Sequence, residues 1–269
     1  MRRIAFINEK GGTGKTTLAV NVAAWLAKAR NARVLLADLD TQGHAGKSLG
    51  VDVRGLRPNI ADLLFDDRVQ VNDVLVRTGV PNLDLLPANK DLSEFPERIA
   101  GRPDRERRLE QKLADLAGYD YLLFDAPPSM GIVTVNVMLA AEEIVIPVAL
   151  TYFALDGCAE ILETVGRIRD QYGGSRPEVS LVVPTLYRRT SLADAILAKL
   201  RERFPADLSS TVLGFNVQID EAQSHGRTIW EYAPASRGAQ MIEAIAREID
   251  GRGKGKRRGP GEERVRAGR

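Results

Sequence analysis

The chain is poor in cysteine, since Cys158 is the only one among its 269 residues. A single cysteine excludes an internal disulfide framework, a cysteine-rich zinc site and an iron–sulfur cluster ligated within one chain. Long apolar runs are also lacking, because no stretch approaches the roughly 18 residues that a membrane-spanning helix needs. The apolar run near the N-terminus is too short for a secretory signal. These absences predict a cytoplasmic protein.

The charge is small overall but unevenly distributed. The formal net charge is +2, and residues 251–269 hold eight Lys/Arg and two Glu, so that segment carries +6 and residues 1–250 carry −4. The contrast predicts a folded domain over residues 1–250 and a basic, flexible tail over residues 251–269. Such a tail indicates a polyanion contact. The alternative is a solvated segment that only aids solubility.

Candidate strands and helices alternate along residues 1–250. Their continuous apolar runs are typical of parallel strands covered on both faces. The β-α order predicts an α/β fold with a doubly wound, mainly parallel sheet, helices on both faces and a ligand at the carboxyl ends of the strands. Strands are expected over 3–8, 33–37, 82–86, 120–124, 143–148, 179–183 and 210–213. Helices are expected over 18–29, 103–117, 132–141, 155–172, 191–204 and 236–249, with two short ones within 59–77.

A glycine-rich segment lies between the first expected strand and the first expected helix, which is the context of a P-loop. Glu9 stands where the strict pattern has its first glycine. The glycines let backbone amides point at phosphate oxygens, and the helix N-terminus adds its dipole. Lys15 can reach the β- and γ-phosphates, and the Thr16 hydroxyl is placed to ligate Mg²⁺. The predicted cofactors are ATP and Mg²⁺, and the predicted nucleotide-binding residues are Lys10, Gly11, Gly12, Thr13, Gly14, Lys15, Thr16 and Thr17.

Three acidic residues stand at the ends of two further expected strands. Asp38 and Asp40 follow the strand over 33–37, and Asp125 follows the strand over 120–124. An acid at the end of an apolar strand near a P-loop is the Walker B arrangement, which holds Mg²⁺, commonly through a water. A lone Asp there is usually a turn residue, but three beside one P-loop favour a metal and catalytic role. Asp125 and Thr16 are therefore the predicted metal ligands.

Lys10 immediately precedes the glycines, so the segment reads K-G-G-T-G-K-T-T, the deviant Walker A pattern. Here the sequence resembles the ParA/MinD class of P-loop ATPases. Residues 35–43 resemble its D-x-D-P-Q-G motif, with Thr41 in place of proline, and residues 124–131 are similar to its Walker B and switch segment. Residues 224–226 and 236–239 resemble C-terminal motifs of Soj-like partition ParA proteins. The resemblance covers residues 1–250.

The resemblance implies a mechanism. Two ATP-loaded subunits close face to face, and Lys10 of each reaches the phosphates of the other. Asp40 orients the attacking water, while Lys10, Lys15 and Mg²⁺ stabilise the transferred phosphoryl group. The homodimer binds nucleoid DNA without sequence preference. Hydrolysis, weak in the protein alone, is stimulated by a ParB-type centromere-binding protein or a cargo adaptor. The implied role is chromosome or plasmid partition; the alternative is the positioning of a protein cargo, such as a cluster or carboxysome, on the nucleoid.

The segment before residues 224–226 departs from the family pattern. Asn216 is retained and is the expected adenine contact, while Gly214 stands where proline often packs on the base, so only a backbone contact is expected there. Gln218 replaces an arginine that usually contacts DNA, and Thr151 replaces a glutamate that can approach the ribose across the dimer. The arginines expected to contact DNA are Arg188, Arg189, Arg227 and Arg237, helped by the tail.

Two other functions fit the residues less well. A MinD-like membrane switch needs a C-terminal amphipathic helix with an apolar face. The tail has Val265 and Ala267 as its only ordinary apolar side chains besides Pro260, which argues against a membrane partner. A non-enzymatic scaffold is disfavoured because both P-loop lysines and the acidic residues are all present.

Overall fold

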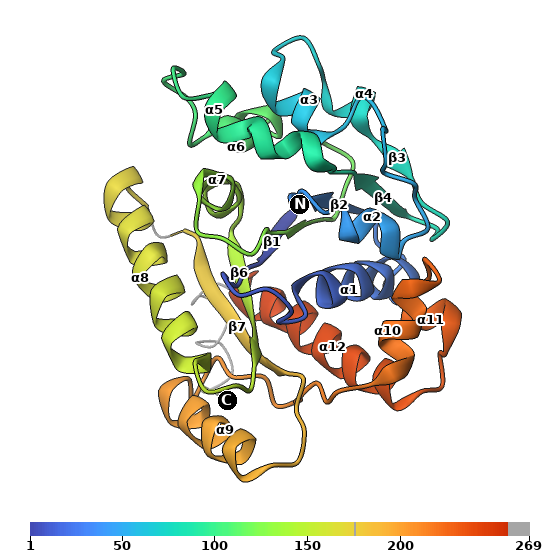
Figure 1. The fold of residues 1–269 in the computed structure, drawn as a ribbon, viewed down its shortest axis with the longest axis vertical. Helices are drawn as coiled ribbons and strands as arrows, with labels where there is room; N and C mark the ends of the chain where they lie inside the picture. Colours follow the sequence, from blue (N-terminus) through green and yellow to red (C-terminus); the bar gives the residue numbers. More distant parts are fainter. Residues whose placement is uncertain (175, 258–269) are drawn as a thin grey trace, which may run out of the picture.

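The fold is built on a seven-stranded sheet, seen in a computed structural model that describes residues 1–174 and 176–257, the last five in their backbone only. The strand order is β3-β4-β2-β5-β1-β6-β7, and every neighbouring pair is parallel except β3 and β4. Figure 1 shows the sheet with β3 and β4 on one side and β6 and β7 on the other. The strands are β1 (Arg2–Phe6), β2 (Val34–Asp38), β3 (Val76–Arg77), β4 (Leu83–Leu86), β5 (Tyr121–Asp125), β6 (Glu143–Ala149) and β7 (Glu178–Thr185).

Helices cover both faces of this sheet. Side chains alternate along each strand, so Ile4 and Phe6 of β1 join one apolar cluster while Ala5 and Ile7 join the other. The first cluster lies under α1 (Lys15–Ala29), α2 (His44–Ser48), α10 (Val217–Ser224), α11 (Ile229–Tyr232) and α12 (Arg237–Arg257). The second lies under α3 (Ile60–Phe65), α4 (Val71–Val74), η1 (Lys90–Glu94), α5 (Phe95–Arg98), α6 (Arg108–Lys112), α7 (Ile132–Ala140), α8 (Ala154–Tyr172) and α9 (Ser191–Arg203).

The topology confirms the predicted α/β fold with a doubly wound, mainly parallel sheet. The connection after β1 leads to β2 on one side, and the connection after β6 leads to β7 on the other. The end of β1 therefore lies at the point where the winding changes direction, which is where such sheets bind ligands. Strand register places Asp125 opposite both Phe6 and Asp38, so the ends of β1, β2 and β5 meet.

The helix expected over 103–117 is wrong in extent, because only Arg108–Lys112 is helical. The buried carboxamide of Asn136, in α7, interrupts it. Its Nδ2 donates to the Arg105 carbonyl at 2.8 Å, and its Oδ1 accepts from the Leu109 amide at 3.0 Å. These two groups would bond each other in a continuous α-helix, four residues apart. Asn136 thus ends the helix and fastens the segment to α7.

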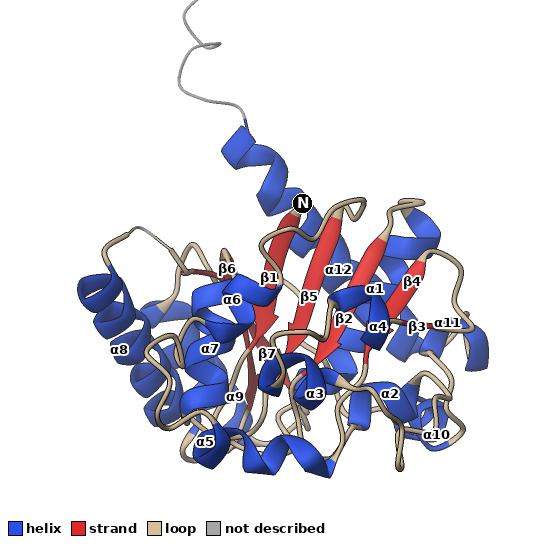
Figure 2. Cartoon of the chain, turned by 90° about the horizontal axis from the view of Figure 1, so that it is seen from above, coloured by secondary structure: helices blue, strands red, loops and turns tan. Residues whose placement is uncertain are grey.

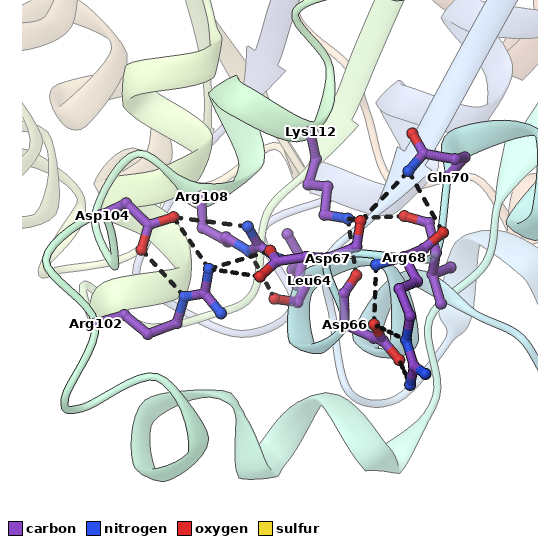
Figure 3. A network of polar contacts seen from close by, with 10 residues as sticks. Leu64, Asp66, Asp67, Arg68, Gln70, Arg102, Asp104, Arg108 and Lys112 are labelled. Carbon is purple, nitrogen blue, oxygen red and sulfur yellow. Dashed lines mark hydrogen bonds and ion pairs between the residues drawn. The ribbon is translucent and has the colours of Figure 1, made fainter.

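A polar network joins α6 to the end of α3 (Figure 3). Arg108 Nε donates to the Leu64 carbonyl at 2.9 Å, and Lys112 Nζ donates to the carbonyls of Asp66 and Val69 at 2.8 and 2.7 Å. The carbonyls of Leu64 and Asp66 stand at the end of α3, where a helix leaves carbonyls without amide partners, and that of Val69 lies in the segment that follows. The network therefore stabilises the packing of α3 on α6.

The strand expected over 210–213 is also wrong. The segment is not a strand but is flanked by two isolated bridges, Val182 of β7 with Leu208 and Tyr187, just after β7, with Gly214. The carboxylate of Glu248, in α12, accepts hydrogen bonds from the amide of Ser210 at 3.0 Å and from its hydroxyl at 2.7 Å. Because that amide bonds a carboxylate of α12, a regular ladder with β7 does not continue through the segment.

Helix α12 is fixed to the end of the sheet at which the parallel strands begin. Arg2, at the start of β1, bonds Glu143 with two nitrogens, at 2.7 and 2.8 Å, and donates to the carbonyls of Ile249 and Asp250. Figure 2 shows the helix leaving beside the N-terminal ends of the strands. It continues to Arg257, past the domain boundary expected at residue 250, and Arg252 donates to the Ser180 carbonyl at 2.6 Å.

The rest of the predicted tail, residues 258–269, lies outside the described residues. The boundary at residue 250 stays a prediction. Within the described part of the chain, no helix is both long enough and apolar enough to cross a lipid bilayer.

Candidate functional site

The loop between β1 and α1 depends on glycine conformations. Gly12 and Gly14 have φ values of +67° and +87°, and Gly14 is the N-cap of α1. These left-handed conformations are unfavourable for residues with a Cβ atom. A Cβ at Gly12 would have no heavy atom within 4 Å, so the backbone angle and not crowding requires glycine there. The two glycines curl the chain back over the start of α1.

The curled loop presents a row of unpaired amides. Within the described chain, no backbone N–H of residues 11–17 donates to an acceptor. Successive free N–H groups at a helix N-terminus form a concave anion site, strengthened by the helix dipole. This arrangement fits the phosphates predicted from the sequence.

Lys15 adds a buried positive charge to the same loop. Its side chain lies largely out of solvent, and its Nζ donates to the carbonyl of Lys10 at 3.0 Å. Burial lowers the pKa of the Lys15 ammonium, while the carboxylates of Asp125 and Asp40 act in the opposite direction. The ammonium is thus held at the loop with acidic groups close by.

The structure brings Thr16 and Asp125 together, as predicted for a metal site. The Thr16 hydroxyl donates to Asp125 Oδ2 at 2.6 Å, whereas Asp125 Oδ1 is buried and has no hydrogen-bond partner within the described residues. Burial raises the pKa of Asp125 to about 7. A hydroxyl and a carboxylate are hard oxygen ligands of the kind Mg²⁺ binds, and Mg²⁺ usually completes its shell with water and phosphate. The pair fits Mg²⁺, although no cluster of three His, Cys, Asp or Glu able to hold a metal occurs in the described chain.

Asp38 and Asp40 have different surroundings. Asp38 is fully buried, and its carboxyl accepts from the amides of Asp40 and Ala45 at 3.0 Å each. Burial raises the pKa of Asp38 well above its usual range, and nearby Asp125 adds to the effect. Asp38 therefore fixes the loop that carries Asp40. Asp40 itself is 9% exposed, and its Oδ1 accepts from the Gln42 amide at 3.0 Å.

Lys10 lies against the first turn of α8 in the single chain. Its Nζ donates to the carbonyl of Phe153 and lies 5.1 Å from the centre of that ring. The ring belongs to an exposed aromatic pair, Tyr152 and Phe153, in edge-to-face contact. The expected contact of Lys10 with the phosphates of a second subunit stays a prediction.

Gly214 and Asn216 lie on a segment that is connected to the P-loop. The Leu213 amide donates to the carbonyl of Pro184, next to Thr185, whose hydroxyl donates to the Thr13 carbonyl. Asn216 is the N-cap of α10, and its Oδ1 accepts from the Ile219 amide at 3.3 Å. The segment lies beside the loop, and the predicted adenine contact of Asn216 stays a prediction.

The four arginines predicted to contact DNA are exposed. The Arg188 guanidinium lies 4.4 Å from the Phe215 ring centre, just before α10. Arg237 precedes Gly238, whose Cβ, if present, would lie 2.8 Å from Asn216 Oδ1. Arg188 and Arg237 therefore flank the start of α10. Arg189 adjoins Arg188 in the chain, and Arg227 follows the end of α10.

Three polar residues that the sequence reasoning missed hold the loop in place. Asn8 Nδ2 donates to the Pro147 carbonyl at 2.7 Å, and its Oδ1 accepts from the Lys10 amide at 3.0 Å. The Thr185 hydroxyl donates to Thr13, and Gln223 Nε2 donates to Thr17 Oγ1 at 2.8 Å. Asn8 and Thr185 stand at the carboxyl ends of strands, which is the one sequence signal that could have found them.

Comparisons with known proteins find similarity over most of the chain. A family model described as an AAA domain matches residues 1–179. The chain is 37% identical to the sporulation initiation inhibitor protein Soj of Bacillus subtilis, covering 93% of this chain and 98% of that protein. It is 40% identical to the chromosome-partitioning ATPase Soj of Thermus thermophilus, covering 93% and 95%.

A solved structure of cobyrinic acid a,c-diamide synthase from Mycobacterium smegmatis, with bound ADP and magnesium, is also similar. Its TM-score is 0.81 at 30% identity, covering 95% of this chain and 96% of that one. The two relatives and this structure are similar over at least 93% of the chain, whereas the family model matches residues 1–179.

The roles of Lys15 and Thr16 can be separated by measuring ATP affinity with and without Mg²⁺. Lys15→Ala should weaken ATP binding about ten-fold or more in both conditions, because it removes a charged hydrogen bond to phosphate. Thr16→Ala should lose mainly the gain in affinity that Mg²⁺ gives, and Thr16→Ser should retain it. Titration calorimetry measures these affinities.

Lys28→Ala, at an exposed position of the same helix, is the matched control and should bind as the unmodified chain does. Undiminished Mg²⁺-dependent ATP binding by both Lys15→Ala and Thr16→Ala would contradict the assignment.

Proposed function

The chain belongs to the Soj/ParA family of P-loop ATPases, and from this we propose that it is a partition ATPase that binds DNA in its ATP-bound, dimeric state. One observation carries the proposal: loop amides without acceptors lie beside the contact between Thr16 and Asp125. This combination fits a nucleotide bound with Mg²⁺. Both relatives carry the name Soj and are more similar in sequence than the synthase, at 37% and 40% against 30%. The higher identity to the Soj proteins favours a partition function over the synthase reaction for which the third protein is named.

The proposed reaction is hydrolysis of ATP to ADP and phosphate. Bound ATP with Mg²⁺ supplies the transferable phosphoryl group. The amides of residues 11–17 and Lys15 bind the phosphates, and Thr16 and Asp125 hold the cation. Asp40 orients the attacking water, with its loop fixed by Asp38. Charge stabilisation by preorganised groups of this kind accounts for much of catalysis in such enzymes.

We further propose that dimerisation moves Lys10. In the single chain its ammonium bonds the Phe153 carbonyl, so a contact with the phosphates of a second subunit requires that bond to break. The phosphate charge supplies the attraction, because a charged acceptor forms a stronger hydrogen bond than a carbonyl does. Lys10 would thereby reduce the phosphate repulsion that opposes closure of two ATP-loaded subunits.

DNA binding is proposed to involve the arginines around α10 together with the tail. Positive charge around this helix comes from Arg188, Arg189, Arg227 and Arg237. The exposed carboxylates of Asp220 and Glu221, on the helix itself, oppose DNA binding there. The tail adds non-specific attraction. A ParB-type protein is the proposed partner that stimulates hydrolysis, since the relatives named Soj favour a partition role over a protein cargo.

Replacing the water-orienting carboxylate should separate binding from chemistry. Asp40→Ala is expected to bind ATP, to dimerise and to remain on DNA, with hydrolysis slower by about 100-fold or more. Light scattering in ATP measures the dimer, and phosphate release measures hydrolysis.

Asp52→Ala is the matched control, because the exposed Asp52 accepts the amide two residues ahead at 3.0 Å, in the same way as Asp40 does. It should hydrolyse ATP normally. Monomeric Asp40→Ala in saturating ATP would show that Asp40 has another role.

Removing the tail should weaken DNA binding without affecting its dependence on nucleotide. Deletion of residues 254–269 removes seven basic and two acidic side chains and keeps Arg252 with its contacts. The salt dependence of DNA affinity should become shallower as phosphate contacts are lost. Ile249 and Asp250 of α12 bond Arg2 at the start of β1, and the P-loop follows the other end of this strand, about 16 Å away, so nucleotide sensing should persist.

The truncated protein is compared with the Arg189→Glu variant. This substitution should reduce the part of the DNA affinity that depends on ATP. DNA affinity measured against salt, in ADP and in ATP, distinguishes the two. An unchanged affinity and salt slope after truncation would show that the folded domain carries all the DNA contacts.

A further inference from the structure

Thr185 is a buried polar residue to which neither the family resemblance nor the motifs assign a role. It is the last residue of β7, at the carboxyl edge of the sheet, and none of its surface is exposed. Its hydroxyl donates to the carbonyl of Thr13 at 2.8 Å, across 172 residues of sequence. Thr13 lies inside the P-loop, between Gly12 and Gly14. A residue of the edge strand therefore holds the loop by one hydrogen bond.

Its methyl group fixes which way the hydroxyl points. A Cβ built on Gly14 would lie 3.7 Å from the Thr185 methyl carbon, which is ordinary van der Waals distance. The methyl group thus packs beside Gly14 while the hydroxyl faces the carbonyl of the preceding residue. β-Branched side chains are stiff at χ1, so this orientation is well defined.

The bond acts on the peptide group between Thr13 and Gly14. In a trans peptide the C=O and the following N–H point in opposite directions. A carbonyl held towards Thr185 therefore turns the Gly14 N–H away from β7. That N–H is one of the amides without an acceptor in the described chain.

Such a peptide needs an external restraint. Gly12 and Gly14 both have positive φ, and glycine crosses between positive and negative φ at little cost. A peptide group beside such residues can rotate, and a rotated Thr13–Gly14 peptide would present a carbonyl oxygen to an anion instead of an amide. Phosphate binding would then be opposed.

From this geometry we propose that Thr185 is a positioning residue for nucleotide binding, whose hydroxyl holds the Thr13–Gly14 peptide with its N–H directed at the phosphates. The inference rests on the proposed nucleotide site.

The residue also lies where other parts of the site meet. The Thr185 carbonyl accepts from the Leu150 amide at 3.3 Å, at the start of the loop that leads to Phe153 and so to Lys10. The neighbouring Pro184 carbonyl accepts from Leu213 at 2.8 Å, just before Gly214. The end of β7 thereby joins the P-loop to two further segments of the site.

The test is nucleotide affinity in variants that differ only in the hydroxyl. Thr185→Val replaces the hydroxyl by a methyl group, and Thr185→Ala and Thr185→Ser form a second pair that differ in the hydroxyl alone. If loss of the bond leaves the binding-competent peptide populated about one time in ten, apparent affinity falls about ten-fold. The dissociation constants for ADP and for Mg²⁺–ATP should rise by that factor in the Val and Ala variants. The Ser variant should bind more tightly than the Ala variant, because it keeps the hydroxyl.

Ser180→Ala is the matched control. Ser180 lies on the same strand, and its buried hydroxyl donates to the Ile144 carbonyl at 3.3 Å, near the opposite end of β7. Its removal should leave both dissociation constants unchanged. Thermal unfolding without nucleotide shows how far each variant is destabilised, which is a separate quantity from affinity.

The outcomes are distinct. Weaker binding by Val and Ala, with rescue by Ser and no change in Ser180→Ala, supports the inference. Unchanged affinity in both Val and Ala overturns it, and so does an equal loss in Ser and Ala or in Ser180→Ala. Failure of the unmodified chain to bind nucleotide would overturn the proposed function itself, which the same titration shows.

Discussion

The conformation of the loop between β1 and α1 is the constraint on which the rest of the site depends. Positive φ angles at Gly12 and Gly14 leave the amides of residues 11–17 without acceptors in the described chain. At the same edge Asp38, Asp40, Asp125 and Lys15 are buried, at a desolvation cost that raises the pKa of Asp125 to about 7. A polyphosphate with Mg²⁺ offsets both features, because its anion pairs with the amides and Lys15 while its cation pairs with Asp125.

The two ends of the parallel strands have different roles. The carboxyl ends of β1, β2, β5 and β7 carry the residues of the proposed nucleotide site, whereas α12 is tied to the amino ends through Arg2 and Glu143. Helix α10 connects regions at the first edge, since Gln223 bonds Thr17 near its end and Asn216 caps its start. This helix is therefore one connection from the P-loop to the arginines proposed to contact DNA, and the bond from Thr185, three residues before Arg188, to Thr13 is another.

The sequence was sufficient where local pattern decides structure. Apolar runs located β1, β2, β4, β5, β6 and β7 to within two residues at each end. The P-loop pattern and an acid at the end of an apolar strand predicted the contact between Thr16 and Asp125. Prediction from the sequence failed where a side chain far away in the sequence bonds the backbone of the segment. Asn136 breaks the helix expected over 103–117, and Glu248 takes the amide of Ser210. Thr185 and Gln223 belong to no motif, and their partners lie 172 and 206 residues away, so no local pattern indicated these bonds, although Thr185 stands at the carboxyl end of a strand.

We propose that bound nucleotide controls the attachment of this chain to DNA. The most direct measurement is co-sedimentation of the unmodified full-length protein with non-specific DNA, in Mg²⁺–ADP and in Mg²⁺–ATP at the same salt concentration. The account predicts affinity about ten-fold or more higher in ATP, with the bound protein dimeric. Equal affinity in ADP and ATP, with both nucleotides bound, would contradict it.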